Sequence, residues 1–146
     1  MPGVAGILRG NQADIGEDLP GPRAQIVDVA DPANPRIVGA VDTPGYAVNV
    51  AIAGNFAFVA DATSGLQVVD FANPARPRIV STVHTPGTVR CVAISGDLAF
   101  IADDWAGIEV VDISNPALPV IVSAIDTPGS AYGIDVSGSY IYVADG

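Results

Sequence analysis

The stretch Gly65-Leu-Gln-Val-Val-Asp70 returns 42 residues later as Gly107-Ile-Glu-Val-Val-Asp112. A weaker copy, Gln25-Ile-Val-Asp28, lies the same distance before it. Similarity at a fixed period is the sequence signature of a repeat protein, in which each unit packs against its neighbours. The recurring phrase therefore predicts a repeated structural unit.

Each repeat contains four short apolar runs, and in the central repeat these cover residues 46–52, 56–60, 66–71 and 78–83. They are rich in β-branched residues and are separated by Gly and Pro, which favours short antiparallel strands over helices. The run Phe56-Ala-Phe-Val-Ala60 is apolar at consecutive positions, so both of its faces need cover. A four-stranded sheet covered on both faces by copies of itself is a blade of a β-propeller.

The turns between these runs have their own chemistry. Thr43-Pro44-Gly45 and its two later copies are predicted to form type II turns, with Gly at the position that needs positive φ. Gly54 and its copies are predicted to make the hairpin between the first and second strands. Asp28 and its copies, which follow the third strand, are expected to accept backbone N–H groups at the next bend.

Val59-Ala-Asp61 through Gly65-Leu-Gln-Val-Val-Asp70, followed by Asn73-Pro74 and later by Thr-Pro-Gly, resembles the LVIVD repeat. The resemblance covers about residues 25–146. It implies an all-β fold of four-stranded propeller blades, commonly in secreted or surface-attached proteins, with no activity shared across the family. An extracellular or cell-surface location is expected on this basis, although no signal peptide is visible.

The repeat divides the chain into a degenerate lead-in or linker at residues 1–24, with a short strand considered at residues 4–8, and propeller repeats at 25–146. Residues 25–42 form half a blade, 43–84 and 85–126 one blade each, and 127–146 another half. This is about three blades' worth, whereas a closed propeller has about four to eight. One interpretation is an open arc from a longer propeller; the other is a homo-oligomer in which two chains complete a six-bladed ring.

A formal net charge of −10 and the absence of lysine argue against nucleic acid as a partner, because phosphate binding needs clustered positive charge. No apolar run reaches the length of about 20 residues that a membrane span requires. The single cysteine excludes an intrachain disulfide framework.

Candidate ligand-binding positions lie at the start of each first strand, which is nearest the axis of a propeller. These positions differ between repeats while their neighbours do not, as expected if the scaffold is constant and one face binds. The alternative is sequence drift at loosely packed positions. Three of the four candidates come from this region and the fourth, an aromatic residue, from the loop between the second and third strands: Asn49, Arg90, Tyr132 and Trp105.

No phosphate-binding loop, His/Cys metal spacing or nucleophile with an adjacent base is evident, so the chain is predicted to be non-enzymatic and without a cofactor. Asp61, Asp103 and Asp145 are interpreted as structural residues, with Ca²⁺ ligation as the alternative because this ion prefers oxygen ligands. A binding or scaffold module for a protein or surface carbohydrate is therefore expected. The alternative is part of a Ca²⁺-dependent hydrolase with its metal in the central channel.

Overall fold

A computed structural model describes residues 22–146, and the short strand considered at residues 4–8 lies outside this range. The described part contains twelve strands in four antiparallel sheets. The two complete blades are β3 (Asn49–Ala53), β4 (Phe56–Ala60), β5 (Leu66–Asp70) and β6 (Arg78–Val83), then β7 (Cys91–Ser95), β8 (Leu98–Ala102), β9 (Ile108–Asp112) and β10 (Val120–Ile125). Two-stranded sheets precede and follow them: β1 (Arg23–Asp28) with β2 (Arg36–Asp42), and β11 (Ala131–Ser137) with β12 (Tyr140–Asp145).

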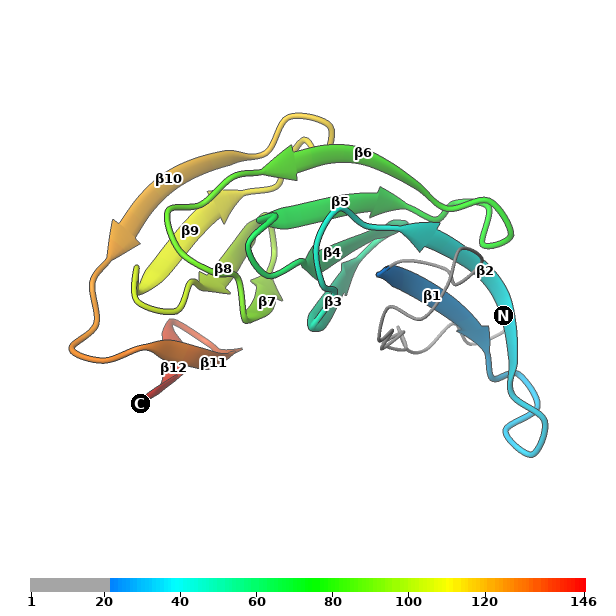
Figure 1. Ribbon diagram of the computed structural model, residues 1–146, viewed down its shortest axis with the longest axis horizontal. Helices are drawn as coiled ribbons and strands as arrows, with labels where there is room; N and C mark the ends of the chain where they lie inside the picture. The colour runs from blue at the N-terminus through cyan, green and yellow to red at the C-terminus, as the bar shows by residue number, and fades with distance from the viewer. Residues whose placement is uncertain (1–21) are drawn as a thin grey trace, which may run out of the picture.

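The four sheets follow one another in an arc that does not close (Figure 1). The first strands β3, β7 and β11 contact one another in turn along its inner side, whereas the fourth strands β6 and β10 lie on its outer side. This confirms the predicted all-β fold, the four-stranded antiparallel blades and the 42-residue period. The predicted second and fourth runs of the central repeat coincide with β4 and β6.

The hydrophobic core lies between blades, where the face of one sheet packs on the next. The largest cluster joins the two complete blades, and Phe58, Leu66 and Ile101 within it have no exposed surface. Two smaller clusters join the two-stranded sheets to their neighbouring blades, one containing Val59 and the other Ile108. Both faces of β4 and β5 are therefore buried, as the unbroken apolar runs indicated.

The hairpins between first and second strands have the glycine conformation that the sequence predicts. Gly54, Gly96 and Gly138 have φ of 58°, 57° and 58°, while the residue that follows each glycine does not have positive φ. Positive φ at only the first of two central residues is the type II′ pattern, which matches the twist of the flanking strands.

The predicted type II turns at Thr-Pro-Gly are wrong. Gly45, Gly87 and Gly129 are not among the residues with positive φ. They are small for another reason: a Cβ at Gly45 would lie 2.3 Å from the carbonyl oxygen of Asp61, and one at Gly87 would lie 2.0 Å from that of Asp103. Close approach of a second backbone segment therefore explains the glycine at this position.

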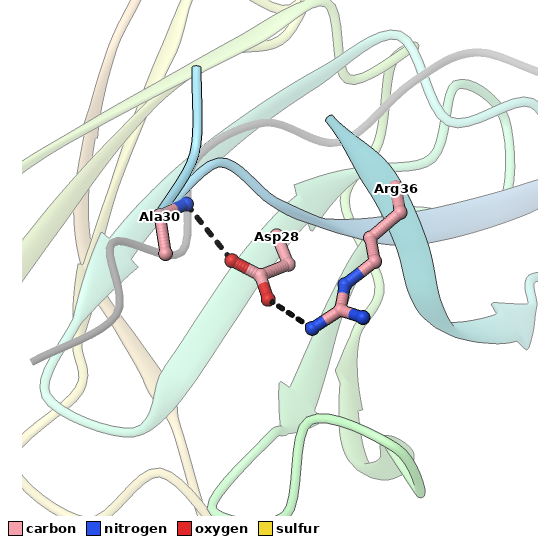
Figure 2. Close-up of polar contacts among 3 residues, drawn as sticks. All are labelled: Asp28, Ala30 and Arg36. Carbon is pink, nitrogen blue, oxygen red and sulfur yellow. Dashed lines mark hydrogen bonds and ion pairs between the residues drawn. The ribbon is translucent and has the colours of Figure 1, made fainter. Parts of the chain in front are cut away.

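The acidic residue at the end of each third strand organises the bend that follows. The carboxylate of Asp28 accepts the backbone N–H of Ala30 at 2.9 Å and a guanidinium N–H of Arg36 at 3.2 Å (Figure 2). The hydrogen bond from Ala30 is the largest cause that lowers the pKa of Asp28, and the hydrogen bond from Arg36 is the next largest. Asp70 and Asp112 accept the equivalent backbone N–H bonds from Ala72 and Ser114, which confirms the predicted role.

Within residues 22–146, the structure contains no helix with the length and apolar character needed to cross a membrane.

Candidate functional site

The candidate residues gather at one end of the blades. In each blade this end carries the connection into the first strand and the loop between the second and third strands, because the strands are antiparallel and sequential. Cys91 at the start of β7 pairs with Ala102 at the end of β8, so Arg90 and the loop at residues 103–107 are neighbours. The axial positions chosen from the sequence therefore share a surface with these loops.

An aspartate in each of three loops binds the Thr-Pro-Gly segment of the same repeat; Asp61 and Asp103 are buried, whereas Asp145 is exposed. Asp61 accepts the N–H of Gly45 at 2.8 Å, and Asp103 accepts that of Gly87 at 2.9 Å. Both oxygens of Asp145 accept the N–H of Gly129, at 3.1 and 3.0 Å. These carboxylates hold the entry to the first strand against the loop, a structural role consistent with the first interpretation of these residues.

Burial distinguishes two of these aspartates electrostatically from surface carboxylates. Asp61 and Asp103 have no exposed surface. Loss of hydration raises the pKa of each, and the hydrogen bonds from Gly45 to Asp61 and from Thr85 and Gly87 to Asp103 act in the opposite direction. The Thr85 hydroxyl donates to Asp103 Oδ1 at 2.6 Å.

The residue after each buried aspartate links neighbouring blades through its backbone. Ala62 and Asp104 have φ of 51° and 53°, a left-handed conformation that is uncommon outside glycine. The carbonyl of Ala62 accepts the N–H of Val89, and Asp104 exchanges two backbone hydrogen bonds with Ala131, at 3.1 and 2.9 Å. The unusual conformation thus coincides with the contact between blades.

A polar and aromatic cluster lies beside the backbone link between Asp104 and Ala131. Arg90 donates from Nε and Nη2 to Asp104 Oδ2, at 2.9 and 2.6 Å. Its guanidinium carbon also lies 5.8 Å from the centroid of the Tyr132 ring, within the range of a cation–π contact. The Arg90 hydrogen bond is the main cause that lowers the pKa of Asp104, so this carboxylate is the ionised partner of Arg90 at neutral pH.

Two aromatic side chains of this region are open to solvent. Trp105 follows Asp104 directly and is 64% exposed, and Tyr132 is 52% exposed. The Arg90 side chain retains 40% of its accessible surface. We refer to Arg90, Asp104, Trp105 and Tyr132 as the Arg90 cluster.

Asn49 lies apart from this cluster. Its side-chain oxygen accepts the backbone N–H of Val92 at 3.0 Å, which connects the first strands of the two complete blades. Cys91 occupies the same position one repeat later, and its sulfur lies 3.7 Å from the carbonyl oxygen of Ile134 in the next sheet. The structure thus brings Arg90, Tyr132 and the loop of Trp105 together and places Asn49 in a contact between blades.

Asp104 was not among the candidate residues, although a signal for it exists in the sequence. The equivalent residue one repeat earlier is Ala62, so a charge enters the loop in only one of these two copies. Glu109 is a second residue that differs between repeats, because it occupies the position of Gln67 one repeat earlier. The Gln67 amide donates to the carbonyl of Ser64, and its side-chain oxygen accepts the Thr82 hydroxyl. Glu109 is 5% exposed, and burial followed by the nearby charge of Asp103 raises its pKa.

The carboxylates do not gather into an evident metal site in the part of the chain that the structure describes. No group of three or more His, Cys, Asp or Glu side chains is arranged there to hold a metal ion. The loop aspartates that were considered for Ca²⁺ are instead engaged with glycine N–H groups.

Comparison with known protein families gives four matches to the LVIVD repeat, at residues 25–43, 44–85, 86–127 and 128–146. The boundaries agree with the observed repeats and with the Thr-Pro-Gly segments that separate them. A search of curated protein sequences gave no match.

Proposed function

The chain belongs to the LVIVD repeat family, and from this premise we propose that it is a non-enzymatic module that binds a protein partner through the Arg90 cluster. The observation that carries the proposal is an exposed Tyr132 beside an arginine that is already held in place, with the exposed Trp105 directly after the Asp104 that holds it. Trp, Tyr and Arg are the residue types most often responsible for binding energy at protein interfaces. An extracellular or cell-surface setting is part of the proposal and derives from the family resemblance.

Preorganisation is the physical reason that Arg90 suits this role. Its two bonds to Asp104 and its position over Tyr132 restrict its side-chain rotamers before a partner arrives. Ordering a rotamer-rich side chain at an interface costs about 0.5–1.5 kcal/mol, and a side chain ordered in advance avoids much of that cost. The remaining guanidinium surface and the aromatic rings are available for contact.

The repeat architecture supports the same proposal. The contacts between a loop aspartate and the glycine of Thr-Pro-Gly recur in three repeats, whereas the cluster combines residues that do not recur. Repeat proteins commonly bind in this manner, with a constant scaffold that presents variable residues. Both side-chain oxygens of Asp103 already accept hydrogen bonds from Thr85 and Gly87, which supports a binding role over a Ca²⁺-dependent hydrolase at this loop.

The proposal can be tested while the partner is still unidentified. Peptides would be selected from a random phage-displayed library on the immobilised chain, and their Kd then measured on purified variants. We expect Trp105→Ala and Arg90→Ala to weaken selected peptides at least about tenfold, as expected for hot-spot residues. Leu118→Ala is the matched control, because Leu118 is 72% exposed and lies in a loop at the other end of its blade.

If the selected peptides bind the wild type and both cluster variants with equal Kd, the Arg90 cluster is not the binding surface. Binding of immobilised oligosaccharides with no selectable peptide would change the partner class to carbohydrate. A thermal midpoint that shifts with excess CaCl₂ and returns with EDTA would favour the hydrolase alternative; we expect no shift.

A further inference from the structure

Glu109 is a buried carboxylic acid in the core between the two complete blades. It pairs with Ile101 across β8 and β9, and residues paired in this way project from the same face of a sheet. Ile101 belongs to the largest hydrophobic cluster and has no exposed surface, and Glu109 is only 5% exposed. Both blades that enclose this core lie within the described residues.

The preceding repeat shows which chemistry this position accommodates. Gln67, one repeat before Glu109, donates from its amide to the carbonyl of Ser64 at 2.9 Å, and its side-chain oxygen accepts the Thr82 hydroxyl at 2.6 Å. Both ends of this neutral side chain therefore have a partner, as a buried polar group requires. The amide also ties the loop at residues 61–65 to the strand that follows it.

The loop after β8 repeats the backbone of its earlier copy. Ala106 donates its N–H to the carbonyl of Asp103 at 3.0 Å, and Ser64 makes the same bond to Asp61 at 3.0 Å. The carbonyl of Ala106 therefore corresponds to the Ser64 carbonyl, which accepts the Gln67 amide. The residue that replaces this glutamine meets an acceptor at the same point.

Only the protonated form of Glu109 matches these surroundings. Its partner on β10 is Ala124, whereas Gln67 pairs with Thr82, so the hydroxyl that the glutamine oxygen accepts is absent. A carboxylate accepts hydrogen bonds but donates none, whereas a protonated carboxyl donates one O–H. The carbonyl of Ala106 can accept that O–H in place of the amide N–H.

Asp103 supplies the negative charge that acts on Glu109. Burial is the larger cause and this charge the smaller one, and both raise the pKa of Glu109. The Thr85 hydroxyl and the Gly87 N–H donate to Asp103, which favours its ionised form. Of the two neighbouring carboxyls, Glu109 is therefore the one that retains its proton.

The other ionisable groups of the surrounding elements lie away from this position. β8 and β10 contain none. Three are at the opposite ends of β5, β6 and β9, two are exposed residues just after β6 and β10, and one is directed at the following sheet. They are, in that order, Asp70, Arg78, Asp112, His84, Asp126 and Cys91. Asp104, next to Asp103, is paired with Arg90.

We propose that Glu109 is a proton-dependent support for the loop at residues 103–107. Its protonated carboxyl donates to the carbonyl of Ala106 and anchors the loop, as the Gln67 amide anchors the earlier copy. When the proton passes to water, the carboxylate meets that carbonyl and the charge of Asp103, and the anchor is lost. The support is built into the second complete blade and is absent from the first, because glutamine does not titrate.

The loop carries half of the Arg90 cluster, because Asp104 and Trp105 belong to it. Folding raises the pKa of Glu109 above its ordinary value of 4.5, so the support is complete below that value and is lost as pH rises through the folded-state value. Binding at the Arg90 cluster should weaken over the same range. This last step rests on the proposed function, whereas the response of the loop does not.

The first test needs no partner, because Trp105 is the only tryptophan of the chain and its fluorescence reports on the loop. We expect its anisotropy to fall in a transition above pH 4.5 in the wild type, and Glu109→Gln to remove that transition. Glu109→Gln with Ala124→Thr, which restores both partners of the glutamine, should remove it as well. Asp126→Asn is the matched control and should keep it, because Asp126 is exposed and adjoins the same loop at Gly107.

The second test measures the peptides selected on the Arg90 cluster at both ends of the Trp105 transition. Their Kd for the wild type should rise about fivefold from low to high pH, which is the factor that corresponds to one neutral hydrogen bond. Their Kd for Glu109→Gln should stay constant, and circular dichroism would establish that every variant keeps its sheet content.

A wild-type Trp105 signal without a transition, or a transition that persists in Glu109→Gln, would overturn the proposal, as would its loss in Asp126→Asn. A constant peptide Kd across a transition that is present would overturn the link to binding and leave the proposed function intact. A transition that Glu109→Gln removes, with no peptide bound at any pH, would support the role of Glu109 in the loop and contradict the proposed function.

Discussion

Phe58 and Tyr142 occupy the same position in two repeats, on the second strand of their blades, yet Phe58 has no exposed surface and Tyr142 is 62% exposed. Both strands are apolar over most of their length and both follow a glycine hairpin of the same type. The difference lies in what stands in front of each strand. Phe58 packs into the core shared with the next complete blade, whereas no described blade faces Tyr142.

The burial of a propeller strand is thus decided by its neighbours. The same apolar run forms a core in one repeat and an exposed surface in another.

The largest effect is expected for the buried member of the pair. Phe58→Ala should lower the free energy of unfolding by about 3–5 kcal/mol, because it removes a fully buried ring and leaves a cavity. Tyr142→Ala should change it by no more than about 0.5 kcal/mol. Urea denaturation measures both, and similar losses for the two variants would break the comparison.

Substitutions of two glycines should also differ in their cost to stability. Gly87→Ala places a Cβ 2.0 Å from the Asp103 carbonyl oxygen and should cost about 2–3 kcal/mol, because backbone must shift. Gly96→Ala meets no atom within 4 Å but has φ of 57°, so only backbone strain of about 1–2 kcal/mol is expected. Equal costs would contradict the distinction between close approach and positive φ.

The pH dependence of stability should report the buried aspartates. Burial raises the folded-state pKa of Asp103, so its favourable contribution is full below the unfolded value of 3.8 and is lost as pH rises through the folded value. Asp103→Asn stays neutral, and its stability relative to the wild type should therefore improve as pH rises above 3.8. Thermal melts across this range measure the difference, and the opposite trend would contradict the pKa direction.

A small effect on stability is also expected at the exposed cluster. Arg90→Ala should cost no more than about 1 kcal/mol, because the pair is partly open to solvent and screened. The Asp104 carboxyl should show the change instead: its pKa, lowered chiefly by Arg90, should rise in the variant. Carboxyl ¹³C chemical shifts followed through acid titration measure it, and an unchanged midpoint would contradict the pairing.

Much of the fold could be predicted because each strand or turn assigned in one repeat could be compared with its copy in the next repeat. The second and fourth strands of the central blade, the Gly96 hairpin and the role of Asp70 depend on residues close in sequence; the first strand, predicted at residues 46–52, is observed at Asn49–Ala53. The Thr-Pro-Gly turn was assigned wrongly, since the reason for Gly45 is a carbonyl group 16 residues away. Local turn rules cannot detect a constraint of that kind.

The candidate site was predicted in part for a related reason. Arg90 and Tyr132 were identified as residues that differ between copies, but their approach to each other depends on how one blade packs on the next. Asp104 was missed because its partner is known only after folding. Asn49 varies in the same manner as Arg90, yet its side chain is used in a contact between blades.

The sequence by itself determined the four-stranded repeat, its period and its family, because apolar runs, hairpin glycines and capping aspartates act over a few residues. The tertiary structure decided which strands are covered, which side chains remain exposed, and why the glycine of Thr-Pro-Gly is needed. These properties depend on contacts between segments 16 to 42 residues apart, such as Gly45 with Asp61 or Arg90 with Tyr132, whose pairing no local pattern encodes.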